Sequence, residues 1–187
     1  NRNITLGAIT GNVSLPYIFD KTTSDQSITN SNTETSLYSF VVPANTLTNH
    51  GILQLELTGT YINNTAGTST LTLVIKYDDT TMYADVTNAL GQSASLRAWK
   101  LYATLAPSNN SSSAQSLDVE FWISDVGGAT TGFGNADDDE SQVLTVVGGT
   151  AAENATTALT FDVRFQHQTA DTNITITRKT AVMRYLP

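Results

Sequence analysis

The residues of this sequence that could do chemistry are two histidines, one acidic run and one tryptophan. His50 lies in a turn-like stretch and His167 at the end of an alternating segment, and neither has a nucleophile or carboxylate at a catalytic spacing. Because His167 falls on the apolar phase of its segment, we expect a buried or interfacial histidine with satisfied hydrogen bonds. No hydrolase, metalloprotease, P-loop or dinucleotide-binding motif is present. Two carboxylates would be enough for a glycosidase, but none of the 17 acidic residues lies in a recognisable context, so we expect no enzymatic activity.

The acidic run consists of Asp137, Asp138, Asp139 and Glu140. Carboxylate oxygens are the ligands that Ca²⁺ prefers, but the run lacks the spacing and the later glutamate of an EF-hand loop. The alternative interpretation is a solvated loop tip whose charge aids solubility. We expect no metal and no cofactor, and keep the three aspartates as candidate contacts with a ligand or a neighbouring subunit.

Trp122 lies on the polar phase of the segment 117–124, beside Asp118 and Glu120. A tryptophan there could stack on a sugar ring, anchor a contact between subunits, or be covered by a loop or by the N-terminal segment of its own chain. The pattern leaves these three roles open. Trp99, in contrast, alternates in phase with Leu101, which predicts a place in the core.

An alternation of apolar and polar residues with period two recurs along the chain and predicts strands. It is clearest at 53–57, 70–75, 117–124 and 159–166. Further strand candidates are 37–43, 80–87, 95–106, 142–147 and 173–186. About nine short strands separated by turn-rich breaks predict an all-β fold, an antiparallel β-sandwich with a jelly-roll-like topology as the first choice.

The first 36 residues lack a sustained core pattern, so we expect an extended N-terminal arm over 1–36 and a β-sandwich domain over 37–187. The arm could add a strand to a neighbour or to its own sheet. Two loops, 107–114 and 126–141, are the places where a sandwich of this kind would carry a binding site.

Composition excludes several classes of function. The net charge is −8 and Lys and Arg number only 9, so the chain lacks the positive stripe that a nucleic-acid-binding protein needs. The longest apolar runs are a few residues, far below the ~20 that span a bilayer, so we expect no membrane insertion. The chain has no cysteine, which excludes disulfides and thiol chemistry.

Several segments stand out in order along the chain. They include Leu37-Tyr38-Ser39-Phe40, Val42-Pro43-Ala44-Asn45-Thr46, Gly59-Thr60-Tyr61-Ile62-Asn63-Asn64-Thr65 and Thr160-Phe161-Asp162-Val163-Arg164-Phe165-Gln166-His167. This series, from about 33 to 180, resembles a group of virion proteins of tailed bacteriophages, and its motifs are structural rather than catalytic. The resemblance implies a trimeric β-sandwich head on a virion appendage or on the capsid surface.

We therefore expect a non-enzymatic structural protein on the exterior of a phage particle, a capsid-decoration or fibre-head module. Its expected partners are two further copies in a homotrimer and another virion protein, either the major capsid protein or a fibre or tail protein. One alternative is a receptor-binding head that recognises a host-surface glycan through Trp122 and the two loops. Another is a secreted carbohydrate-binding module, which would present a flat aromatic platform on one sheet face.

Overall fold

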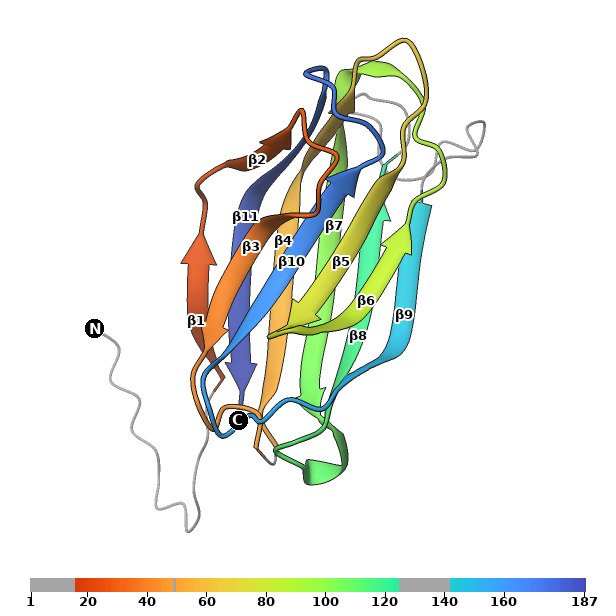
Figure 1. The fold of residues 1–187 in the computed structure, drawn as a ribbon. Helices are drawn as coiled ribbons and strands as arrows, with labels where there is room; N and C mark the ends of the chain where they lie inside the picture. Colours follow the sequence, from red (N-terminus) through yellow and green to blue (C-terminus); the bar gives the residue numbers. More distant parts are fainter. Residues whose placement is uncertain (1–15, 49, 125–141) are drawn as a thin grey trace, which may run out of the picture.

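The computed structural model describes residues 16–48, 50–124 and 142–187, and they form two antiparallel sheets that pack face to face (Figure 1). The larger sheet has seven strands, in the order β1-β11-β4-β7-β8-β9 with β2 also paired to β11. Its strands are β1 (Tyr17–Thr22), β2 (Gln26–Thr29), β4 (Ile52–Asn63), β7 (Ser93–Pro107), β8 (Gln115–Ile123), β9 (Gln142–Ala151) and β11 (Ile174–Leu186). The predicted all-β, jelly-roll-like sandwich is confirmed.

The smaller sheet has four strands in the order β3-β10-β5-β6. Its strands are β3 (Thr35–Val42), β5 (Leu71–Tyr77), β6 (Thr80–Val86) and β10 (Leu159–His167). One turn of 3₁₀ helix, η1 (Ser108–Asn110), interrupts the loop after β7. No helix in the described part of the chain is long and apolar enough to span a membrane.

The alternation in the sequence becomes an alternation between core and solvent. Along all twelve residues of β4, half-buried and buried side chains follow one another, so Leu53, Leu55 and Leu57 enter the core. Gln54 and Glu56 lie between them on the outer face. Burying one leucine contributes about 1.5–3 kcal/mol, so a shift of one residue in register would be strongly unfavourable.

An aromatic cluster joins the two sheets. Trp99 of β7 and Phe121 of β8 come from the large sheet and Phe165 of β10 from the small one, and their ring centroids lie 5.7–6.1 Å apart. The Trp99 indole N–H donates a hydrogen bond to the Thr60 carbonyl at 3.1 Å, which satisfies its one polar atom. Trp99 is buried, as its phase predicted.

The described part of the N-terminal segment belongs to the sandwich. β1 and β2 pair with successive stretches of β11, so this segment adds strands to its own sheet, one of the two alternatives considered. Arg178 fixes the connection between them, since its guanidinium donates to the carbonyls of Ser24 and Leu37. The division of the chain after residue 36 stays a prediction.

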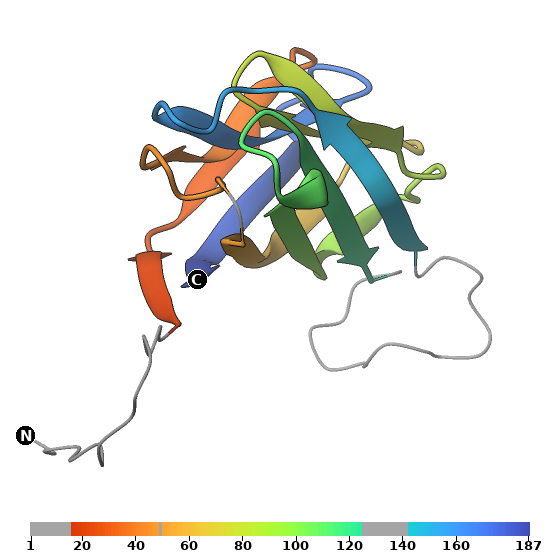
Figure 2. The ribbon, with the colours of Figure 1, turned by 90° about the horizontal axis from the view of Figure 1, so that it is seen from below.

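The two lateral sides of the sandwich close differently (Figure 1 and Figure 2). On the side of β1 and β3, the stacked rings of Phe19 and Phe40, 5.7 Å apart, fill the space between the sheets. On the side of β6 and β9, the strands approach so closely that a Cβ on Gly149 would lie 2.5 Å from the Met82 carbonyl oxygen. The preceding Gly148 has φ +95°, which suits the irregular register of β9 at this point.

Replacing Gly59 with alanine should destabilise the protein, because the new methyl group would lie 2.5 Å from Cζ2 of Trp99 and against the Thr177 carbonyl oxygen. Overpacking of a filled core costs about 1–3 kcal/mol. Urea unfolding would measure this loss. Gly67→Ala is the matched control, since nothing lies within 4 Å of its added carbon. Equal stabilities of the two variants would contradict the packing described here.

Candidate functional site

Trp122 lies on the outer face of the large sheet. Its neighbours along β8, Phe121 and Ile123, are buried, whereas Trp122 is half-buried, and it pairs in register with Lys100 of β7. Trp122 therefore lies on the outward side of its strand, as the sequence predicted. Stacking on a sugar, anchoring a subunit contact and cover by its own chain remain the three predicted roles. Asp137, Asp138 and Asp139 lie outside the described residues.

Around Trp122, side chains from four neighbouring strands meet on this face. Tyr102 of β7 is 40% exposed, and the Lys100 ammonium lies 4.3 Å from the centre of its ring. Lys100 Nζ also lies 3.1 Å from Glu56 Oε1 on β4. The second carboxylate oxygen of Glu56 lies 3.5 Å from Arg184 Nη1 on β11. We name these five residues, Trp122, Tyr102, Lys100, Glu56 and Arg184, the outer strip.

The three charged residues of the outer strip form ion pairs with one another, Glu56 with both Lys100 and Arg184. The hydrogen bond from Lys100 is the main reason why the pKa of the Glu56 carboxyl lies below its ordinary value, and the nearby Arg184 acts in the same direction. Glu56 is therefore a carboxylate at neutral pH, held between two cations. Sequence analysis did not single out Tyr102. Its phase in the segment 95–106, opposite to that of Trp99, was the signal that could have placed it on the outer face.

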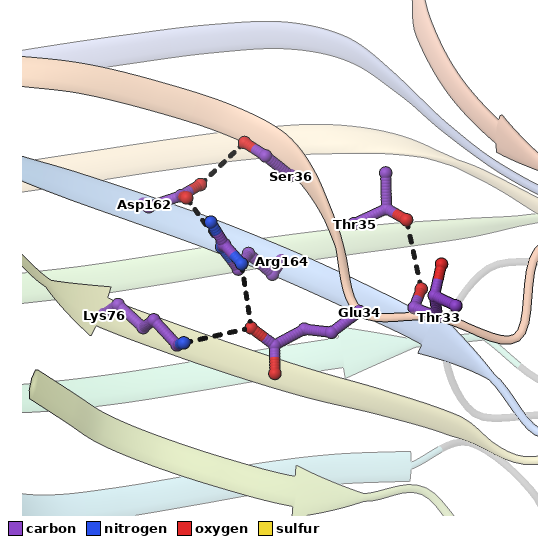
Figure 3. A network of polar contacts seen from close by, with 7 residues as sticks. All are labelled: Thr33, Glu34, Thr35, Ser36, Lys76, Asp162 and Arg164. Carbon is purple, nitrogen blue, oxygen red and sulfur yellow. Dashed lines mark hydrogen bonds and ion pairs between the residues drawn. The ribbon is translucent and has the colours of Figure 1, made fainter. Parts of the chain in front are cut away.

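A second polar network covers the outer face of the small sheet (Figure 3). Arg164 of β10 donates from Nε to Asp162 at 2.7 Å and from Nη1 to Glu34 at 3.1 Å. Ser36 donates to the other oxygen of Asp162 at 2.6 Å, and Lys76 Nζ lies 3.3 Å from Glu34. The network ties the beginning of β3 across β10 to β5.

This network holds two carboxylates, Glu34 and Asp162, and it does not resemble an acid–base pair. Arg164 bridges Glu34 and Asp162, and both carboxylates have a second partner. A glycosidase instead needs one carboxyl that holds a proton and one that faces the substrate. Within the described ranges, no group of three or more His, Asp or Glu residues could hold a metal ion. That the chain is not an enzyme stays a prediction.

The two histidines have contrasting surroundings. His50 is exposed in the turn before β4. His167 is buried at the end of β10, where Nε2 lies 3.2 Å from the Ile28 carbonyl oxygen of β2 and the Tyr61 ring centre lies 6.1 Å away. Its Nδ1 is buried without a hydrogen-bond partner. The expected burial is correct, and only one of the two ring nitrogens is satisfied.

Burial lowers the pKa of His167, and the contact with the Ile28 carbonyl offsets only part of this effect. The unfolded chain takes up a proton at an ordinary pKa of about 6.5. Below that pH the unfolded state binds more protons than the folded state, so stability should fall as the pH drops from 7 to 5. His167→Gln, which removes the titration, should flatten this dependence in urea unfolding. His50→Gln should keep it, and equal slopes for the native protein and His167→Gln would contradict the assignment.

Breaking the network of Figure 3 at its centre should cost more than breaking it at its edge. Arg164→Met removes a partner from the largely buried Asp162 and from Glu34, and we expect a loss of about 1–3 kcal/mol. Lys76→Met removes one partly exposed ion pair and should cost about 0–1 kcal/mol. Denaturant midpoints of the two variants would separate these values, and the reverse order would exclude Arg164 as the centre.

No protein-family model matches the chain, and no curated protein matches its sequence. Among solved structures, it is similar to the CBM2 module of the evolved Dit of Lactobacillus casei BL23 phage J-1, with 8% identity and a TM-score of 0.36 over 78% of this chain and 67% of that one.

It is also similar to a chain of the Gx strain of infectious bursal disease virus, with 12% identity and a TM-score of 0.36 over 92% of this chain and 42% of that one. A third similarity is to the VP2 subviral particle of the same virus, with 16% identity and a TM-score of 0.32 over 97% and 45% of the two chains. The chain spans less than half the length of these two viral chains, and all three similarities are distant ones of fold.

Proposed function

We propose that this chain is a non-enzymatic structural module on the exterior of a tailed-bacteriophage particle, a capsid decoration or fibre head that assembles as a homotrimer. Two lines of reasoning support the proposal. The order of motifs from about 33 to 180 resembles phage virion proteins, and the sandwich gives those motifs structural positions in strands and turns. The partner at the point of attachment would be the major capsid protein or a fibre or tail protein.

The observation that carries the proposal is an exposed apolar surface on an edge strand. Tyr17 and Ile18 of β1 are 50% and 56% exposed. The Tyr17 ring packs edge-on against Phe19 and Tyr185, at 4.9 and 5.3 Å, so it is the outer member of an aromatic cluster. A rigid aromatic side chain on a fixed base is the kind of residue that anchors subunit contacts.

The geometry of the sandwich also suits a ring of three. β1 and β3 form one lateral side of the molecule and β6 and β9 form the other (Figure 1). Val86 at the end of β6 is 48% exposed. If the β1 side of one copy packs against the β6 side of the next, the interface is heterologous, and a rotation of one third of a turn between copies would close it into a ring of three. A trimer would thereby cover both edges of the large and small sheets, which otherwise invite uncontrolled strand pairing.

The solution mass tests this proposal directly. The full chain should show about 60 kDa in light scattering after size exclusion, three times the 20.0 kDa of one chain. The double variant Tyr17→Ser, Ile18→Ser should show a much smaller mass, because it removes the apolar contact. Leu96→Ser, which alters a residue of similar exposure (49%) on β7, should leave the mass unchanged.

A mass of about 20 kDa for the unaltered chain at micromolar concentration would overturn the trimer. An unchanged mass of the double variant would remove β1 as its interface, and with it the observation on which the proposal depends.

A further inference from the structure

The outer strip brings two aromatic rings together on one face of the large sheet. Lys100 pairs with Trp122 and Tyr102 pairs with Glu120 across β7 and β8, so Trp122 and Tyr102 are diagonal neighbours on the same face. Diagonal neighbours of this kind lie about 7–8 Å apart, within reach of one ligand. The rings stand on the central part of the large sheet, where the strands beneath them are fixed by the buried cluster of Trp99, Phe121 and Phe165.

The polar groups beside the rings carry charges that nearly balance. Glu56 is fixed by Lys100 on one side and Arg184 on the other. Glu120 lies on the same face, opposite Tyr102, and Asp118 of β8 is exposed on that face as well. Three carboxylates thus accompany two cations. An anionic polymer gains nothing from such a surface, whereas an uncharged ligand with many hydroxyl groups meets both acceptors and donors.

We propose that the outer strip binds a neutral polysaccharide. The C–H face of a sugar ring would lie on Trp122 and on the side of the Tyr102 ring away from Lys100, while its hydroxyl groups would donate to Glu56 and Glu120 and accept from Lys100 and Arg184. Aromatic faces supply the contact area and a few placed polar groups supply the orientation, which is the usual composition of a ligand site. This activity is additional to the structural role and does not depend on a trimer.

The opposite face of the sandwich provides an internal comparison. Its central strands carry Asp162, Arg164 and Lys76, which contact one another and Glu34. The outward positions on β10 and β5 carry no aromatic side chain, since their intervening aromatic residues, such as Phe161 and Phe165, are buried. The two faces therefore differ in the feature that sugar stacking requires, although both have paired charges.

Affinity electrophoresis in native gels tests the proposal. The full chain should be retarded by at least one of five neutral polymers, namely hydroxyethylcellulose, laminarin, dextran, galactomannan and xylan. Tyr102→Ala and Trp122→Ala should each weaken the retardation about tenfold or more, as expected for the loss of one stacked ring. Val41→Ala is the control, because Val41 is 61% exposed on the small sheet, and it should bind like the native protein.

Tryptophan fluorescence gives a second measurement that is independent of mobility. The chain has only two tryptophans, and Trp99 is buried in the core. Titration with the retarding polymer should therefore change the emission of Trp122, and the change should be absent in Trp122→Phe. Tyr102→Ala alters an exposed side chain, so its thermal midpoint should match that of the native protein and a loss of binding would not reflect unfolding.

Absence of retardation by all five polymers would overturn the proposal, as would retardation that Tyr102→Ala leaves unchanged. If Trp122→Ala instead lowers the solution mass without any effect of a polymer, the face is a protein interface and the proposal is wrong. Because mass and sugar binding are measured separately, failure of the trimer would leave this result intact.

Discussion

The structure depends on the filling of the space between the two sheets by Trp99. Gly59 on the neighbouring strand leaves room for its indole ring, and the Thr60 carbonyl accepts its N–H. With Trp99 fixed, the register of β4 against β7 is constrained too, because moving β7 by one residue would turn the ring toward solvent and Lys100 toward the core. One side chain therefore decides which residues of the central strands face outward, and the outer strip follows from it.

The edges of the sheets obey a different constraint. A strand in the middle of a sheet is satisfied on both sides, but among the described residues β1, β3, β6 and β9 each have one side without a paired strand. The chain covers the gap between β6 and β9 with its own backbone, through the close approach of Gly149 and Met82. At the other side, the aromatic rings of Phe19 and Phe40 fill the gap and leave Tyr17 half exposed. This asymmetry is what makes the β1 side the stronger candidate for contact with another subunit.

Much of the fold could be predicted from the sequence because its central strands alternate so regularly. The four clearest segments became β4, β5, β8 and β10, and both Trp99 and His167 lie where their phase placed them. For β1 and β2, the sequence predicted only that the segment 1–36 could add a strand to a neighbour or to its own sheet, without bounds. β1 has an irregular register between Ile18 and Asp20, and β2 has only four residues, so neither offers a period long enough to recognise. Their position is instead set by contacts with β11, more than a hundred residues away along the chain.

The same distance in sequence explains why the polar groupings were missed. Glu34 and Arg164 are 130 positions apart, and Glu56 and Arg184 are 128 apart, so no local pattern links them. A single strand reveals that Trp122 faces outward, but only the pairing of β7 with β8 brings Tyr102 beside it. In a sandwich, the surface to which the outward residues of one strand belong is known only when the neighbouring strands are known. Sequence periodicity can therefore place each candidate side chain on a face, and the order of strands decides which of them can act on the same ligand.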